Sequence, residues 1–184
     1  DITPGVALTY FSDFKFFAFP GVDVGYELLD NLKVYGNLGY TYRIPTFTDL
    51  NYKSPNTIGN PDLEPEKAFS QEIGVKWNTV RFNVSVAVFN RNSNHLIDYV
   101  KMQLTDPWQA QNIQDVTTKG FETQLLYQFN INSFNQKLQF GYSFIQNDIA
   151  QSTFAFSQYS LNSMKHQFVG SYAMQFLKNF TNTV

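Results

Sequence analysis

Histidine is the scarcest side chain with catalytic or metal-binding chemistry in this 184-residue sequence. The two histidines, His95 and His166, stand about 70 positions apart, and cysteine is absent. No thiolate can therefore complete a tetrahedral zinc site, and no disulfide can form. His95 lies among Asn92, Ser93 and Asn94, a polar segment typical of a solvated loop. We expect neither histidine to bind a metal ion.

Carboxylates are the other groups with chemical potential, and Glu72 and Glu122 lie in stretches of strand-like pattern. No Gly-x-Ser-x-Gly motif and no Ser/His/Asp set can be named beside them. Asp62, Glu64 and Glu66 form only a sparse oxygen set for Ca²⁺, and no Gly-rich phosphate loop occurs. We therefore expect no catalytic residue, no cofactor and no enzyme activity. The strand carboxylates are expected to pair with basic side chains on neighbouring strands.

The composition limits the fold that could position these groups. Charged residues make up 15% of the sequence and aromatic residues 17%, with 19 Phe and 11 Tyr, whereas soluble domains average about 25% charged residues. The formal net charge of −2 excludes a basic surface for nucleic acid. Mean hydropathy is slightly negative, and no run approaches the ~20 apolar residues of a spanning helix. Hydropathy alone would suggest a soluble protein, but it does not explain the aromatic excess.

Apolar residues recur at every second position. Between residues 80 and 88, Val or Phe alternates with Arg, Asn, Ser or Ala. Because successive side chains of a strand point to opposite faces, this pattern gives one apolar and one polar face. No segment shows a helical stripe, and the alternation predicts eight strands. They span residues 3–11, 18–29, 32–43, 67–77, 80–102, 110–129, 137–149 and 163–177.

Short and long connections alternate between these strands. Tight turns at 30–31 and 78–79 contrast with a long connection at 44–66. Outer-membrane barrels have short periplasmic turns, long outer loops and strands of ~9 to 11 residues or more. A lipid-facing apolar side and a polar lumen also average to an unremarkable hydropathy. The sequence therefore predicts an all-β, antiparallel, up-and-down transmembrane β-barrel, present in part.

Several motifs occur in a fixed order along residues 42–129. Tyr42-Arg43-Ile44-Pro45 leaves one strand, Gly59-Asn60-Pro61-Asp62-Leu63-Glu64-Pro65-Glu66 enters the next, and Glu-x-Gly and Gly-x-Glu follow. In this order and spacing they resemble the barrel of TonB-dependent outer-membrane receptors, and the alternation extends the likeness over nearly the whole chain. The motif residues expected to shape the wall are Pro45, Gly59, Asn60, Pro61, Leu63, Pro65, Glu66, Glu72, Gly74, Gly120 and Glu122.

The resemblance implies a family barrel of 22 strands, of which about eight lie in residues 1–184, with the plug domain outside this sequence. Both ends of the chain fall within the pattern, so we expect a segment of a longer protein. The implied function is energised import of a scarce nutrient, such as an iron–siderophore complex, heme or cobalamin, across a bacterial outer membrane. The implied partners are outer-membrane lipid, the TonB complex through the plug region, and a small-molecule or metal-chelate substrate.

Individual roles can be assigned to a few of these positions. Substrate contact is expected from Arg43, Asn56 and Trp108, with Trp108 at a loop tip. Gly59 is expected to turn the chain with a positive φ, and Pro61 and Pro65 to hold a rigid bend. Gly74 and Gly120 are expected at bulges or where another backbone approaches closely. Glu66 is expected to reach solvent or to pair with Arg43 or Lys67.

Two other classes of protein fit parts of the pattern. Eight strands suffice to close a small structural or adhesive barrel, although the long motif-bearing connection argues against it. A soluble β-sandwich used as a binding module would also show alternation, but it would normally carry more Lys and Glu.

Overall fold

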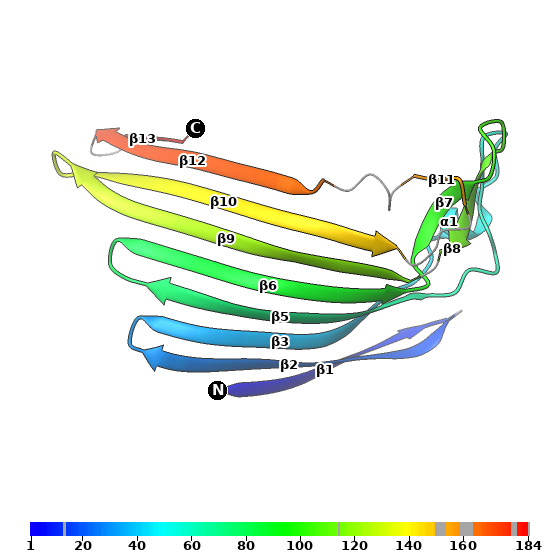
Figure 1. The fold of residues 1–184 in the computed structure, drawn as a ribbon, viewed down its shortest axis with the longest axis horizontal. Coiled ribbons are helices and arrows are strands. Elements are labelled where there is room, and N and C mark those ends of the chain that lie inside the picture. The colour runs from blue at the N-terminus through cyan, green and yellow to red at the C-terminus, as the bar shows by residue number, and fades with distance from the viewer. Residues whose placement is uncertain (13, 114, 150–153, 159–163, 178–179, 184) are drawn as a thin grey trace.

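The computed structural model describes residues 1–12, 14–113, 115–149, 154–158, 164–177 and 180–183. Within these ranges nine strands form one open antiparallel sheet, in the order β1-β2-β3-β5-β6-β9-β10-β12-β13 (Figure 1). The all-β, antiparallel, up-and-down architecture is thus confirmed, as a wall that does not close. The strands are β1 (Ile2–Phe11), β2 (Lys15–Leu29), β3 (Leu32–Arg43), β5 (Glu66–Asn78), β6 (Phe82–Asn94), β9 (Val116–Ile131), β10 (Phe134–Ile149), β12 (His166–Leu177) and β13 (Phe180–Thr183).

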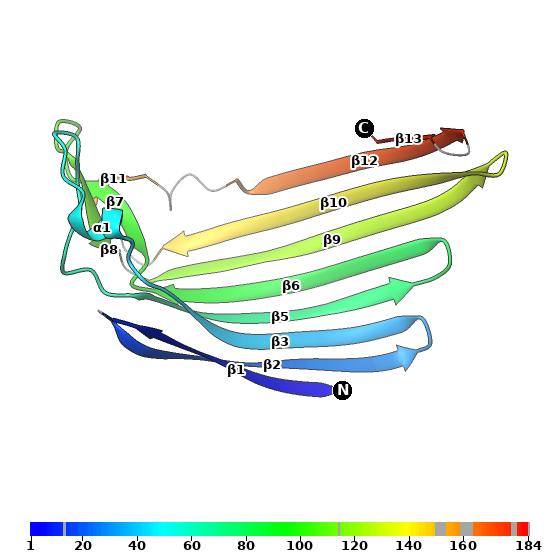
Figure 2. The same ribbon diagram turned by 180° about the vertical axis from the view of Figure 1, so that it is seen from behind.

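A small cap stands at one end of this wall. It contains helix α1 (Phe47–Asn51) and the strands β4 (Thr57–Ile58), β7 (Ile97–Lys101), β8 (Trp108–Asn112) and β11 (Phe156–Ser157). These strands form a second sheet in the order β11-β7-β8-β4, in which β4 and β8 run parallel. The tight turns of the wall lie at the opposite end (Figure 2). Within the described residues, no helix is long and apolar enough to cross a membrane.

The strand register separates the wall into two faces. Asn37 lies opposite Glu72 and Arg43 opposite Glu66 on the polar face, while Val75 pairs with Val86 on the apolar face. The apolar face is open, since side chains such as Val86 remain 45% exposed. A β-sandwich would bury such a face against a second sheet. The open single layer therefore rules out the sandwich alternative.

Aromatic rings form two clusters on the apolar face. Toward the tight turns, the rings of Trp77, Phe82, Tyr127 and Phe129 stack in series, with centroids 6.3, 4.5 and 4.9 Å apart. Toward the cap, the rings of Tyr142 and Phe168 lie 4.6 Å apart, and Phe121 and Phe144 complete that group. Aromatic rings are enriched on the lipid-facing surface of membrane-spanning barrels.

The wall glycines Gly74 and Gly120 face neighbouring rings on the polar side. A Cβ on Gly74 would lie 2.5 Å from the Tyr35 ring, and one on Gly120 would lie 2.6 Å from Phe89 and would collide with the Phe144 carbonyl oxygen. At Gly120 the backbone that lies close is that of the neighbouring wall strand β10. The alternative of a bulge is wrong, because the register runs without a shift through both glycines.

The Gly120 environment gives a first prediction. Gly120→Val should destabilise the folded wall by about 1 to 3 kcal/mol, because the added atoms meet a carbonyl oxygen that cannot move independently of its strand. Gly5→Val is the matched control, since a Cβ on Gly5 meets no atom within 4 Å. Urea unfolding of the refolded protein would compare them, and equal loss in both variants would contradict the steric account.

Two long strands expected from the sequence are each interrupted. The stretch 80–102 divides into β6 and β7 at His95, whose φ of 57° lies in the left-handed region. The stretch 110–129 belongs partly to β8 and partly to β9. Alternation continues through both breaks, so the period alone could not reveal them. The first residue of the expected strand 163–177 lies outside the described residues.

The structure differs from the predicted elements in three further places. Residues 15–17, expected in a connection, already belong to β2, and β13 adds a short strand beyond the eight expected. Helix α1 was not expected either. Its N-terminus is set by a capping box, in which the Thr46 hydroxyl and the Asp49 carboxylate each accept the other residue's backbone N–H.

Candidate functional site

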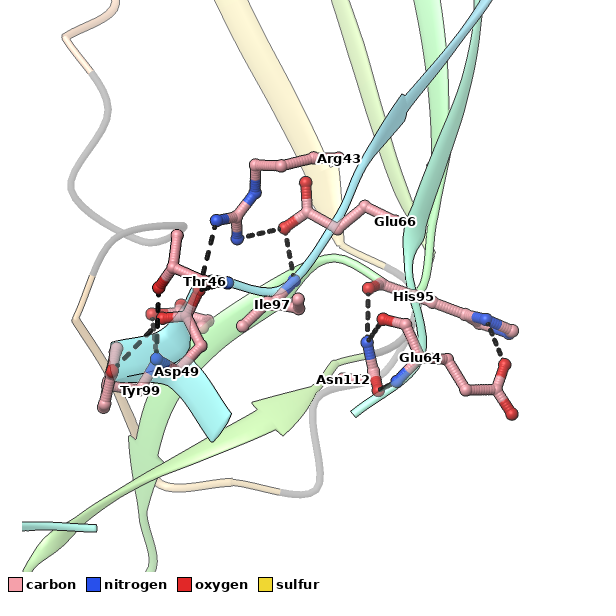
Figure 3. A network of polar contacts seen from close by, with 10 residues as sticks. Arg43, Thr46, Asp49, Glu64, Glu66, His95, Ile97, Tyr99 and Asn112 are labelled. Atoms are coloured by element: carbon pink, nitrogen blue, oxygen red, sulfur yellow. Dashed lines mark hydrogen bonds and ion pairs between the residues drawn. The ribbon is translucent and has the colours of Figure 1, made fainter. Parts of the chain in front are cut away.

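The site lies where the polar face of the wall meets the cap, and its centre is an ion pair between strand ends. Arg43 ends β3 and Glu66 begins β5, and the register places them directly opposite each other. Arg43 Nη2 lies 2.6 Å from Glu66 Oε1, and the same oxygen accepts a hydrogen bond of 2.7 Å from the Ile97 backbone N–H at the start of β7. The expected pairing of Glu66 with Arg43 is confirmed. One carboxylate thus joins two wall strands to the cap (Figure 3).

Asp49 of helix α1 extends this network. Its Oδ2 lies 3.4 Å from Arg43 Nη1, and its Oδ1 accepts a hydrogen bond of 3.2 Å from the Tyr99 hydroxyl. Burial alone would raise the pKa of Asp49, but hydrogen bonds from Thr46 and Tyr99 and the charge of Arg43 together hold that pKa below its ordinary value. Asp49 therefore stays ionised, and the Arg43–Asp49–Glu66 cluster carries a net charge of about −1 near neutral pH.

The Gly59–Glu66 segment packs against α1 and the cap core. The backbone N–H of Gly59 donates to the Tyr52 carbonyl oxygen, and that of Asn60 donates to the Asp49 carbonyl oxygen, at 2.6 and 2.8 Å. The predicted positive φ of Gly59 is wrong, since no glycine in the described residues has one. Glycine is instead required here because the backbone of α1 lies close: a Cβ on Gly59 would be only 2.7 Å from the Asp49 carbonyl oxygen.

The rest of this segment is fixed by a turn and by burial. Asn60 Oδ1 accepts the Asp62 backbone N–H at 3.0 Å, which closes an Asx turn around Pro61. Leu63 then enters the small cap core with Ile97, Tyr99 and Ala110. Pro45 is buried just before α1, while Pro65 is half-buried just before β5. The segment therefore anchors the cap, as a structural motif should.

A second polar contact holds the same segment against β8. Asn112 Nδ2 donates to the carbonyl oxygens of Glu64 and His95, at 2.9 and 2.7 Å, and Asn112 Oδ1 accepts the Glu64 backbone N–H at 2.8 Å. His95 Nδ1 lies 2.8 Å from Glu64 Oε2. His95 thus has a structural partner. Within the described part of the chain, no group of three or more His, Asp or Glu could hold a metal ion.

The three residues expected to touch substrate do not form one group. Asn56 and Trp108 are brought together by the parallel β4–β8 pairing, in which the Trp108 backbone N–H donates to the Asn56 carbonyl oxygen at 2.9 Å. Arg43 instead lies at the wall end, engaged by two carboxylates. Its guanidinium borders a cavity of about 490 Å³ that Thr46, Leu96 and Tyr99 also line.

Trp108 is not at a loop tip, as the sequence had suggested. The turn before it is closed by Asp106, whose carboxylate accepts the Gln103 backbone N–H at 2.9 Å, so Trp108 already begins β8. Its half-buried ring packs on the cap core, and the Lys101 ammonium lies 4.7 Å from the ring centroid. A cation at this distance from an indole face is attracted to it, so the contact links β7 to β8.

Glu72 and Glu122 lie on the polar face of the wall, on β5 and β9. Within the described residues, the ion pairs joining side chains do not include either glutamate. The expected pairing with basic residues of neighbouring strands is therefore wrong for both. Lys76, a basic residue on the same face of β5, instead has its ammonium 4.6 Å from the centroid of the Tyr35 ring.

An open wall whose apolar face carries clustered aromatic rings, and whose polar face ends in a loop-built cap, is the architecture of a membrane β-barrel segment. A family model described as "TonB dependent receptor-like, beta-barrel" matches residues 1–182. The chain belongs to this family. It is therefore part of a β-barrel of the bacterial outer membrane, as the sequence motifs suggested.

Individual relatives agree with this assignment. A vitamin B12 transporter BtuB from Vibrio vulnificus is 31% identical over 97 residues, which cover 53% of this chain and 14% of that protein. The ferric enterobactin receptor of Pseudomonas aeruginosa, solved as a mutant, shares the fold with a TM-score of 0.72 at 13% identity, over 99% of this chain and 29% of the receptor. The siderophore receptor PirA of the same organism gives a TM-score of 0.64 at 17% identity, over 98% and 38%. These relatives are transporters or receptors by name, not enzymes.

Proposed function

We propose that residues 1–184 form part of the wall and outer cap of a receptor that binds and imports a scarce nutrient with energy from the TonB system. The supporting observation is the family match over nearly the whole chain, joined to a polar inner face that ends in a folded cap. A non-enzymatic role fits, because the titratable groups of the site are used to hold the cap on the wall.

The sequence relatives favour cobalamin as the first substrate to test, because the proteins matched at 24 to 31% identity are named vitamin B12 transporters. Iron–siderophore complexes and heme remain the other members of the proposed substrate class. Substrate would meet the cap first, where Asn56 and Trp108 lie side by side, and then the lumen wall. A plug domain in the lumen would couple the barrel to the TonB complex.

The uptake proposal is tested by growth. The full-length gene is expressed in a strain that lacks its own receptors, and cobalamin, heme or an iron–siderophore complex is supplied as the limiting source. We expect growth on one of the three nutrients. Deletion of the TonB gene should abolish this growth, whereas surface binding of the same nutrient should persist. Growth on none of them, or growth independent of TonB, would contradict the proposal.

The same strain tests the contact residues. Trp108→Ala should raise the nutrient concentration needed for half-maximal growth by about tenfold, the scale of one lost aromatic contact. Trp108→Phe keeps a ring on the cap core and should retain most of the uptake. Leu104→Ala is the control, since Leu104 is 75% exposed on the adjoining turn. Equal uptake in Trp108→Ala and Leu104→Ala would remove Trp108 from the substrate path.

A further inference from the structure

The membrane-facing side of the wall carries a shallow groove near its cap end. The groove holds about 630 Å³ and runs across β3, β5, β6, β9 and β10. Its floor is apolar and open, with Ile73 58% and Val88 52% exposed. On the membrane face its apolar lining consists of Leu38, Ile73, Val88, Phe121 and Phe144. Glu72, Phe89 and Gly120 also border it, although the register assigns these positions to the lumen face.

The strand register arranges the groove in two levels. Ile73 pairs with Val88, Val88 with Phe121, and Phe121 with Phe144, so the floor is one apolar row across four strands. Two residues nearer the cap, the same strands carry a second row on the same face. This row consists of Gln71, Asn90, Lys119 and Gln146, paired in that order.

On the apolar face of these strands, charged residues occur only between the floor row and the cap. From the floor row toward the tight turns, the apolar faces of β5, β6, β9 and β10 contain no charged residue. Between the floor row and the cap, the same faces carry two lysines, Lys67 and Lys119, and one aspartate, Asp148. Their net charge is about +1. Asp148 Oδ1 accepts a hydrogen bond of 2.9 Å from Gln146, and its Oδ2 lies 3.9 Å from Lys119 Nζ. The Lys119 side chain stays 60% exposed.

We propose that this groove binds one anionic phospholipid from the membrane leaflet at the cap end, with an acyl chain along the apolar row and its negatively charged headgroup at Lys119. The ammonium of Lys119 supplies the charge-assisted contact, and the amide groups of Gln71, Asn90 and Gln146 supply N–H donors at the same level. A lipid fits better than free phosphate, because the cation stands directly above an apolar floor that phosphate alone would leave uncovered.

Lipid retention tests this site in the full-length protein. The protein is reconstituted in nanodiscs with equal amounts of phosphatidylglycerol and phosphatidylcholine, and the lipids that remain bound are measured by native mass spectrometry. We expect wild-type protein to retain phosphatidylglycerol preferentially. Lys119→Gln should reduce that preference about tenfold, and Val88→Trp, which fills the groove but keeps the charge, should reduce it as well.

Lys137→Gln is the matched control. Lys137 lies on β10 like the groove, but the register with Gln128 and Ala173 places it on the lumen face. Heat-dependent gel mobility confirms that each variant is folded. Unchanged retention in Lys119→Gln or in Val88→Trp would overturn the proposal, and so would an equal loss in Lys137→Gln. Displacement of the lipid by excess inorganic phosphate would show a simple anion site and would overturn it too.

Discussion

Val86→Lys is expected to impair membrane assembly severely, at a cost of about 2 to 4 kcal/mol for a lysine near the middle of the bilayer. Val86 lies on the apolar face of β6, between Val75 and Thr123 of the neighbouring strands. The floor row of the groove lies two residues away toward the cap, and the stacked rings of Trp77, Phe82 and Tyr127 lie toward the turns. A lysine at this position is too deep for its ammonium to reach either interface without distortion.

Asn83→Lys is the control for this variant, on the same strand but on the opposite face. The exposed Asn83 pairs with Asn78 and Leu126, so a lysine there enters the polar lumen and should assemble nearly as well as wild type. Heat-dependent gel mobility of the full-length protein in lipid vesicles reports the folded fraction, and urea unfolding gives the free-energy difference. Similar losses in both variants would mean that the two faces have been assigned wrongly.

The wall was predictable from the sequence because its determinants are local and repeated. From Phe82 to Val88 in β6, and for most positions from Phe121 to Phe129 in β9, every second side chain is apolar. A one-residue error in register would place charges such as Glu72 and Glu122 in lipid. The bounds of the strands, and therefore the positions of the turns, were predicted from where this alternation begins and ends. The motifs then placed Arg43 and Glu66 at two strand ends joined by a long connection, which is why their pairing could be expected.

The cap was not predictable in the same way, since its contacts join residues distant in sequence. The Tyr99 hydroxyl reaches Asp49 across 50 positions, and Asn112 reaches Glu64 across 48. The break at His95 depends on a left-handed backbone conformation that alternation does not encode. One local signal was available: Thr46 followed by Asp49 has the spacing of a capping box, and it marks the start of α1.

Glu66→Ala is expected to release the cap from the wall. The Glu66 side chain is only 10% exposed, and its loss leaves the buried Ile97 N–H without its acceptor, which costs about 1 to 3 kcal/mol. The pair with Arg43 adds about 1 kcal/mol, because the arginine is 46% exposed and solvent screens it. Trypsin should then cleave the folded protein faster after Lys53 and Lys101, which lie in the cap.

Glu64→Ala removes a carboxylate only two positions away and should leave this cleavage nearly unchanged. The Glu64 side chain is 67% exposed and pairs with the exposed ring of His95, so its removal is expected to cost less than about 0.5 kcal/mol. Arg43→Ala should have an intermediate effect, since it leaves Glu66 bonded to Ile97. In the double variant, Arg43→Ala with Glu66→Ala, the loss should be smaller than the sum of the two single losses, because both remove the same ion pair. Additive losses would mean that the Arg43–Glu66 ion pair does not couple the two residues. Equal cleavage in Glu64→Ala and Glu66→Ala would mean that the cap is held by its apolar core and not by the Glu66 carboxylate.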